Sequence, residues 1–191
     1  MTVIMTDTPA YLKDPQERLT EAGFACGDTW YHGTSSALLG SIQAYGLNRS
    51  GDKAMKQAAK QTMATIGNSY TESIEPVFLT QSKELAYYWG RQAVRDRSVR
   101  VEGDEKAVVL AITLPEELNA QVKPDVGAAS LLLIPEGEAY MAFVAGLYQE
   151  RNLLAPEIDL MKADRMDYLN KLGMAYIDRD VDFDYVTVLS E

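Results

Sequence analysis

Residues 29–47 constrain the fold more than any other segment, because a strand, a helix start and a helix end follow one another directly. The letters T-W-Y-H are typical of a short buried strand. Ser35 or Ser36 suits a helix N-cap, since its hydroxyl can accept a hydrogen bond from a free backbone N–H. Gly46 suits the left-handed residue that ends a helix. The apolar stripe between them consists of Leu38, Leu39, Ile42 and Tyr45.

A second strand and helix follow a polar excursion over residues 48–74, which itself contains a basic helical piece, D-K-A-M-K-Q-A-A-K-Q-T-M. P-V-F-L-T predicts the strand, and the segment that begins S-K-E-L predicts the helix. A-V-V-L-A-I-T-L-P predicts the strongest strand, ended by Pro115. Further strands are expected at L-L-L-I-P and F-D-Y-V-T-V-L, and further helices near residues 15–25, over G-E-A-Y-M-A-F-V-A-G-L-Y-Q-E-R-N and over residues 158–172.

No linker divides these elements. We therefore expect a single α+β domain over residues 29–191, behind an N-terminal extension formed by residues 1–28. Strands and helices do not alternate one for one, which argues against a doubly wound parallel sheet.

The charge of the chain is uneven. The formal net charge of −10 argues against non-specific attraction to nucleic acid or anionic lipid. Residues 1–100 carry 11 Lys and Arg against 10 Asp and Glu, whereas residues 101–191 carry 7 against 18. In the first half, Lys53, Lys56 and Lys60 would share one helix face, and so would Arg91 and Arg95. These faces are either solvated surface or contacts for a phosphate backbone.

Cys26 and His32 are the only cysteine and the only histidine in the sequence. One cysteine forms no internal disulfide, and this pair is a poor ligand set for zinc, so we expect no metal. The N-terminus lacks a basic segment and an apolar run, and no stretch reaches the eighteen or so apolar residues of a spanning helix. We expect a cytoplasmic protein with no membrane partner; export without a cleaved signal stays open.

Several short pieces occur in the order found in a known enzyme family. They are Y-H-G-T, an I-x-x-x-G-L helix end, V-F-L-T, S-x-x-x-A-x-Y, and the strand A-V-V-L-A-I-T-L-P followed by L-x-x-x-x-x-P-D. In this order they resemble the NAD-binding half of the ADP-ribosyltransferases of the diphtheria-toxin and poly(ADP-ribose) polymerase type, described by a His-Tyr-Glu signature. The resemblance implies an ADP-ribosyltransferase-like fold, with a mostly antiparallel split β-sheet and flanking helices, and NAD+ as co-substrate.

The resemblance also implies roles for individual residues. His32 is expected to hydrogen-bond ribose hydroxyls, because a neutral imidazole both donates and accepts. Gly33 would let backbone groups approach the nicotinamide carboxamide, and Thr34 would add a hydroxyl. Phe78 stands where the family has its signature tyrosine, and Tyr88 matches a second family tyrosine, with core packing as its alternative. The expected cofactor contacts are Tyr31, His32, Gly33, Thr34, Phe78 and Tyr88.

The third signature group is an acid before a C-terminal strand. Breaking the bond between nicotinamide and ribose passes through an oxocarbenium-like centre, which a nearby negative group stabilises. The family has glutamate in an E-Y-I or E-Y-V context, whereas this chain has F-D-Y-V-T-V, so the resemblance gives the role to Asp184. The catalytic residues are then His32 and Asp184, and Glu138 and Glu150 are the alternatives to Asp184.

The leading hypothesis is an NAD-dependent mono-ADP-ribosyltransferase that modifies a protein or nucleic acid, as a bacterial or phage toxin or defence effector. An antitoxin or inhibitor protein would be a further partner. One alternative is an RNA 2′-phosphotransferase-like enzyme, which shares the fold but should show more basic residues for the RNA phosphate. The other is a degenerate transferase fold that binds a partner, indicated by Phe78 and Asp184 in place of the signature tyrosine and glutamate.

Overall fold

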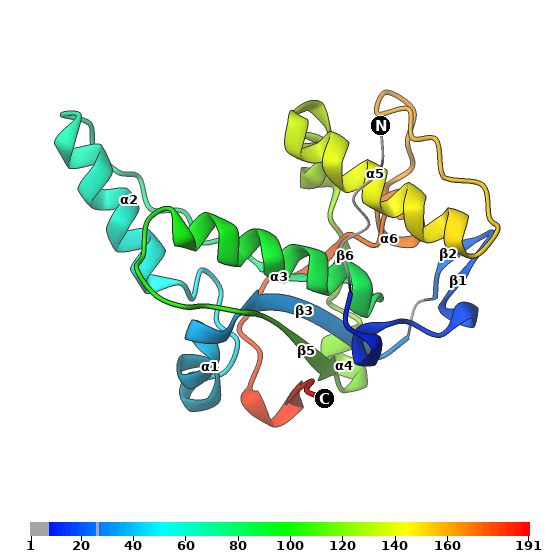
Figure 1. Cartoon of the computed structure of the whole chain (residues 1–191), viewed down its shortest axis with the longest axis horizontal. Helices are drawn as coiled ribbons and strands as arrows, with labels where there is room; N and C mark the ends of the chain where they lie inside the picture. The colour runs from blue at the N-terminus through cyan, green and yellow to red at the C-terminus, as the bar shows by residue number, and fades with distance from the viewer. Residues whose placement is uncertain (1–7, 26) are drawn as a thin grey trace.

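The computed structural model describes residues 8–25 and 27–191, and within them it shows an α+β protein with two three-stranded antiparallel sheets (Figure 1). One sheet has the order β3-β5-β8, and the other has the order β4-β7-β6. The strands are β3 (Thr29–Ser35), β5 (Ala107–Thr113), β8 (Val186–Val188), β4 (Val77–Leu79), β7 (Ala175–Ile177) and β6 (Lys123–Pro124). A small hairpin pairs β1 (Leu19–Thr20) with β2 (Gly23–Phe24). The α+β class expected from the sequence is confirmed.

The two sheets meet at one point. Tyr31 of β3 and Thr80, which follows β4, exchange two backbone hydrogen bonds of 2.7 and 3.0 Å. No other pair of described residues joins β3 to β4 in a ladder. On its opposite edge, β3 pairs with β5 along its whole length, from Thr29 opposite Thr113 to Ser35 opposite Ala107. The edge of β3 beyond Tyr31 therefore opens into the space between the sheets.

Helices cover this framework and complete two apolar cores. α3 (Lys83–Ser98) lies across β3 and β5, and it begins at Ser82, whose hydroxyl accepts a hydrogen bond from the Leu85 N–H at 3.1 Å. η3 (Ser36–Leu38), α1 (Leu39–Tyr45) and α4 (Glu116–Asn119) border the core between the sheets. α5 (Pro135–Glu150) and α6 (Arg165–Asn170) pack a second core against α3, around Tyr88 and Tyr140.

α2 (Lys53–Thr65) projects away from the rest of the molecule (Figure 1). Its N-cap is Asp52, whose carboxylate accepts a hydrogen bond from the Met55 N–H at 3.1 Å. None of the residues of α2 is buried. We call residues 48–75, which contain α2 and the segment returning to β4, the arm. The helix expected in the excursion is confirmed, and it owes little of its stability to the apolar cores.

The helix expected near residues 15–25 is wrong. η1 (Ala10–Leu12) and η2 (Gln16–Arg18) are single 3₁₀ turns, and the β1–β2 hairpin follows. Gly23 has a φ of 108°, a conformation that an ordinary helix residue does not adopt. Leu12 is fully buried against β3 and α3, and Asp14 accepts hydrogen bonds from the start of α3. The described part of the N-terminal segment therefore packs into the body, while Cys26 lies outside the described residues.

Three expectations for the second half also need correction. L-L-L-I-P forms η5 (Leu131–Leu133) rather than a strand, because η4 (Val126–Ala129) leads through it into α5. The helix expected over residues 158–172 is reduced to α6, which begins at the Asp164 capping box. The last expected strand keeps only β8, since its first residues form η6 (Phe183–Tyr185). The sequence pattern did not predict β7, because a strand of three residues is too short to show an alternation of apolar and polar residues.

Candidate functional site

A cavity of about 770 Å³ lies where the two sheets separate. Its lining comes from β3, β4, β7, α3, η4 and the end of the arm. Four of the residues expected at a cofactor site line it together: Tyr31, His32, Gly33 and Phe78. The structure therefore gathers most of the residues expected around a nicotinamide group, although they come from segments more than forty positions apart.

His32 spans the gap between the sheets. Its Nδ1 lies 2.7 Å from the backbone carbonyl oxygen of Phe78. Because a carbonyl oxygen only accepts, Nδ1 carries the proton in this bond. Burial lowers the pKa of His32 below 6.5, and the bond to Phe78 only partly offsets this effect. The ring is therefore neutral at pH 7, and its Nε2 is left as a hydrogen-bond acceptor for a hydroxyl.

Gly33 supplies backbone polar groups to the cavity. Residues two apart on a strand direct these groups to the same edge, and Tyr31 directs its N–H and C=O toward Thr80. The N–H and C=O of Gly33 must therefore point toward the same edge of β3 as those of Tyr31. At Gly33, however, β4 is no longer beside this edge, and the cavity lies there instead. No backbone hydrogen bond from another described segment reaches this pair. An N–H beside a C=O on one strand edge is the complement of a primary carboxamide, which offers one acceptor and one donor.

The missing side chain of Gly33 has a second consequence. A Cβ at this position would lie 1.7 Å from the Ala86 carbonyl oxygen and 2.5 Å from the Gly90 nitrogen, both in α3. Glycine is therefore required for the close contact of β3 with α3, independently of any ligand. From the sequence we expected Gly33 only to allow the approach of a ligand, and packing against α3 is an additional reason for a glycine at this position.

Aromatic rings line the cavity, but they differ in part from those expected. Phe78 points its ring into open space, with 45% of its surface exposed. Tyr88 is 6% exposed and stacks on Phe143 in the second core, with ring centroids 5.0 Å apart. Its neighbour Trp89 lines the cavity instead, supported by stacking on Tyr140 at 5.0 Å. The structure thus places Tyr88 in its alternative role, core packing.

The remaining expected cofactor contacts lie deeper. Tyr31 lines the cavity and is 8% exposed, and burial raises the pKa of its hydroxyl. Thr34 is 4% exposed and does not line the cavity. Its backbone lies against Gly90, where a Cβ on that glycine would come within 3.2 Å of the Thr34 nitrogen. The structure therefore does not bring Thr34 together with the other site residues.

Asp184, the acid expected from the resemblance, does not line the cavity. It is an exposed residue of η6, before β8, and β8 pairs with β5 on the side away from β3. The alternatives Glu138 and Glu150 are exposed residues of α5 and do not line the cavity either. None of the three acids weighed from the sequence therefore lines the cavity with His32.

Two other carboxylates line the cavity, Asp125 and Asp178. Asp125 precedes η4, and burial raises the pKa of its carboxyl, an effect that hydrogen bonds from the Ala128 and Gly127 N–H groups partly offset. Asp178 directly follows β7, and its carboxylate lies 3.3 Å from the Arg49 guanidinium. Asp125 was visible in the sequence only as the end of the P-D piece. Asp178 gave no signal, because β7 itself was not expected.

No group of three or more His, Cys, Asp or Glu side chains in the described part of the chain is arranged to hold a metal ion. Within the same residues, no single helix combines the length and apolar character needed to cross a membrane. The bent pair Val126–Leu133 and Pro135–Glu150, which meet at 108°, meets that test by length and composition only.

In comparisons with known proteins, no family model, no curated protein and no solved structure matches this chain.

Proposed function

We propose that this protein is an NAD-dependent mono-ADP-ribosyltransferase, with the nicotinamide end of NAD+ bound in the cavity between the two sheets. The observation that carries the proposal is a combination on β3: a backbone N–H and C=O at Gly33 that no other described segment pairs, beside the neutral, oriented imidazole of His32. The first would pair with the carboxamide, and the second would accept a hydrogen bond from a ribose hydroxyl. Phe78 and Trp89 supply the aromatic surface for the nicotinamide ring.

The arrangement of the strands supports the same proposal. A split antiparallel sheet with flanking helices is what the resemblance to ADP-ribosyltransferases implies, and the two sheets here separate at β3 and β4. These are the strands that carry Y-H-G-T and V-F-L-T. The two pieces of the resemblance thus face each other across the cavity.

In the reaction, the bond between nicotinamide and the ribose carbon breaks, and nicotinamide leaves with the electron pair. A nucleophile on the acceptor then bonds to the same carbon and loses its proton. A carboxylate is needed beside the positive centre between these events. We assign this role to Asp178, because it lines the cavity and its side chain is 67% exposed, so that its charge is accessible to a ligand. Burial disfavours the charged form of Asp125.

The test is incubation of the protein with NAD+ and a cell lysate, with measurement of released nicotinamide and of ADP-ribose joined to macromolecules. His32→Ala should lower both by at least about 10-fold, and Asp178→Asn by about 100-fold or more, as the loss of one electrostatic group in other active sites does. Asp184→Asn is the matched control and should stay within about 2-fold of the wild type. Loss of activity in Asp184→Asn together with full activity in Asp178→Asn would overturn our assignment of the acid.

A binding module without catalysis is the second candidate, and one observation favours it. Asp178 is held by Arg49, which also approaches Asp180 at 3.6 Å, so the carboxylate is partly neutralised. Calorimetric binding of NAD+ without nicotinamide release would identify this case. The RNA 2′-phosphotransferase alternative receives less support, because no lysine or arginine is among the described residues that line the cavity.

A further inference from the structure

α2 is positively charged in a chain that is strongly negative, although the arm as a whole has four Lys and Arg against three Asp and Glu. α2 contains Lys53, Lys56 and Lys60 and no acidic residue, whereas the whole chain has a net charge of −10. Lys56 and Lys60 share a single carboxylate, that of Glu72, at 3.0 and 3.6 Å. The helix therefore keeps a surplus of positive charge, and none of its residues is buried in an apolar core.

Two tyrosines accompany these lysines, the exposed Tyr45 and the half-buried Tyr70. The Lys53 ammonium lies 6.0 Å from the ring centroid of Tyr45, and the Lys60 ammonium lies 6.0 Å from that of Tyr70. Tyr45 is 70% exposed, although it stands at the end of the apolar stripe of α1. Exposed aromatic rings interleaved with cations are the elements of a surface on which unpaired bases stack while lysines contact the phosphates.

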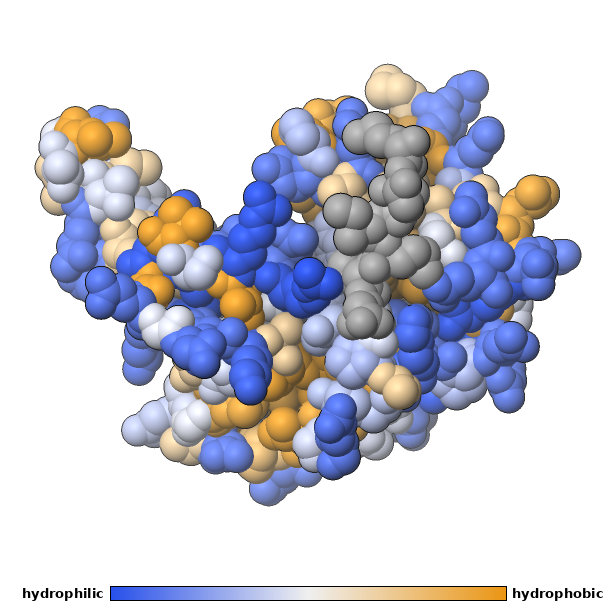
Figure 2. Space-filling model, in the orientation of Figure 1, coloured by the Kyte–Doolittle hydropathy of each residue, from blue (hydrophilic) through white to orange (hydrophobic). Residues whose placement is uncertain are grey.

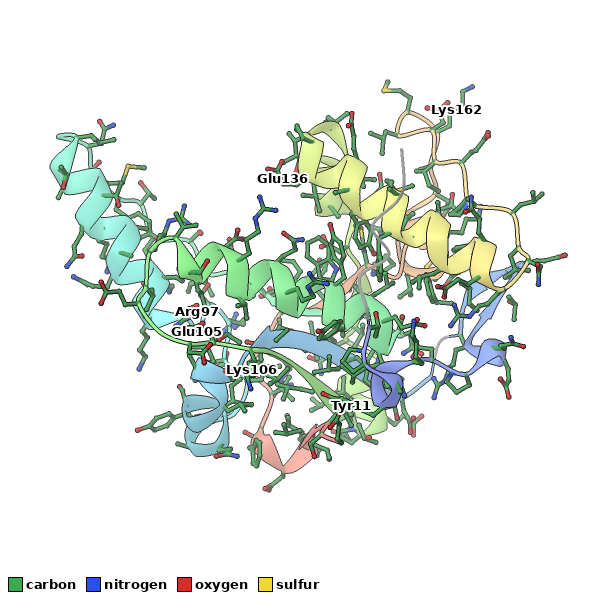
Figure 3. All side chains as sticks on the ribbon, in the orientation of Figure 1. Tyr11, Arg97, Glu105, Lys106, Glu136 and Lys162 are labelled. Carbon is green, nitrogen blue, oxygen red and sulfur yellow. The ribbon has the colours of Figure 1, made fainter. Side chains whose placement is uncertain are left out.

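The second half of α3 extends the basic surface. Arg91 and Arg95 are exposed, and within the described residues no carboxylate lies within ion-pairing distance of either. The end of α3 is joined to the start of α2 by Arg97, whose guanidinium contacts Asp52 and, at 2.7 Å, Glu105. Figure 3 shows Arg97 and Glu105 together at the base of α2, and Figure 2 shows the hollow between the arm and the rest of the molecule.

The side chains of α2 favour a polyanion over a protein or a membrane. A helix that docks into a protein groove presents large apolar anchors at helical spacing, and one that binds a membrane buries a broad apolar face. The nonpolar residues of α2 are four alanines and two methionines. The exposed Ile66 and Ile74 of the arm lie outside α2, so the helix itself presents no broad apolar face, and charge is the main interaction that it offers.

We propose that the arm and the exposed face of α3 bind single-stranded nucleic acid, and that this nucleic acid is the acceptor of the transferase. The second part rests on the proposed function. Ile74, near the end of the arm, and Pro76, which follows the arm, line the cavity, so the returning segment of the arm leads from α2 to the cavity. A base can stack on the exposed ring of Tyr45 only when it is not paired within a duplex. This requirement favours single strands over duplexes.

The binding test uses fluorescence anisotropy with labelled oligo(dT) and oligo(U) of about 20 nucleotides, at about 50 and about 200 mM salt. The variant Lys53→Gln/Lys56→Gln/Lys60→Gln should bind at least about 10-fold more weakly at low salt. Its slope of log affinity against log salt should be smaller by about 2, as expected for three lost phosphate contacts on a single strand. Tyr45→Ala should weaken binding by about 5-fold or more, with the salt slope unchanged.

The matched control is Lys123→Gln/Lys162→Gln/Arg165→Gln, which removes the same charge from exposed positions on β6 and near α6. It should bind as the wild type does, and circular dichroism should show that both triple variants are folded. Equal loss in the two triple variants, or no binding of either oligonucleotide by the wild type, would overturn the proposal. ADP-ribose transfer from NAD+ to lysate proteins only, with none to oligo(dT) or oligo(U), would also overturn it.

Nicotinamide release, measured in the absence of an acceptor, separates this proposal from the proposed function. The α2 triple variant should retain this release, because none of its three lysines lines the cavity. Binding of oligonucleotides without any release would leave the nucleic-acid site standing and remove the transferase. Release of nicotinamide without oligonucleotide binding would support the transferase and overturn the nucleic-acid site.

Discussion

The two halves of α3 hold their neighbours in different ways. The first half buries Glu84, Leu85, Ala86, Tyr88 and Gly90 against β3, the N-terminal segment and α5. The second half buries Arg97 alone, and through it contacts the arm. One half therefore belongs to the framework of the cavity, while the other secures a projecting helix at a single point.

The ionic groups at the two ends show the same difference. At the first end the buried charge is Glu84, 1% exposed, which accepts a 2.8 Å bond from Arg151 and faces Asp14. At the second end the buried charge is Arg97, and its partner Asp52 has a 26% exposed side chain. The framework end is closed to water and the arm end is partly open. Local changes at the arm are therefore expected to leave the cavity intact, whereas changes at the framework end are not.

The largest effect is expected for Gly33→Ala, which tests the contact of β3 with the first half of α3. Its Cβ would meet backbone atoms of α3 at 1.7 and 2.5 Å, and backbone cannot rotate aside as a side chain can. The cost should exceed the range of about 1–3 kcal/mol for ordinary overpacking, so the chain should fail to fold by circular dichroism. Gly40→Ala is the control, because no atom lies within 4 Å of its Cβ position, and it should be neutral or stabilising by up to about 1 kcal/mol. A folded Gly33→Ala protein would contradict the packing.

Arg151→Met tests the framework end and should have the next largest effect. It leaves the Glu84 carboxylate buried without its principal partner, which costs about 3–5 kcal/mol of the free energy of unfolding. Urea denaturation measures this loss. Lys162→Met, which breaks the exposed pair of Lys162 with Asp159, should cost only about 0–1 kcal/mol. Similar losses in the two variants would show that Glu84 is well solvated.

Arg97→Met tests the arm end. We expect a smaller loss of about 2–3 kcal/mol, because two groups remain to stabilise the carboxylates after the guanidinium is removed. Asp52 retains contact with water, and Glu105, whose side chain is 9% exposed, still accepts a hydrogen bond from the Ser35 hydroxyl. Hydrogen exchange should accelerate in α2 and remain slow in β3. Any nicotinamide release shown by the wild type should persist. Faster exchange in β3 as well would mean that the arm and the framework are not separate, and the comparison would fail.

The smallest effect concerns the single histidine of the cavity. The lowered pKa of His32 means that the unfolded chain takes up this proton first as the pH falls below 6.5. Stability should therefore decrease as the pH falls from 6.5 to the folded-state pKa, with a slope of at most about 1.4 kcal/mol per pH unit for one proton. His32→Gln should lack this decrease, which urea denaturation at several pH values measures. Parallel pH profiles for the two proteins would contradict a buried, neutral imidazole.

The sequence located the elements around His32 well, because their signals are local. The strand at T-W-Y-H, the helix ended by Gly46 and the Ser82 cap of α3 all depend on neighbouring residues, and all three are confirmed, with the strand running on to Ser35. The N-terminal helix, the L-L-L-I-P strand and the long helix over 158–172 are wrong. The N-terminal helix gave way to the packing of Leu12 and Asp14 against β3 and α3, whereas the Asp164 capping box sets the start of α6 locally.

The choice between adjacent aromatic residues illustrates the same limit. Tyr88 and Trp89 are consecutive on α3, so the sequence could not show which of them faces the cavity. The direction of a helix face depends on how the helix is rotated about its axis, and β3 fixes that rotation through Ala86 and Gly90 against Gly33. Tyr88 therefore lies in the second core, and Trp89 lies at the cavity.

The sequence by itself determined that a strand carrying His32 and Gly33 runs into a capped helix, and that a second strand ends near Phe78 and leads into α3. These features depend on hydrogen bonding and packing between residues close in the chain. Only the tertiary structure decided which acids line the cavity with His32, because Asp178 reaches the cavity through the pairing of β7 with β4, about one hundred positions away. β7 has only three residues, and a strand so short forms because it pairs and packs with neighbouring strands in the folded protein, not because of its own sequence pattern.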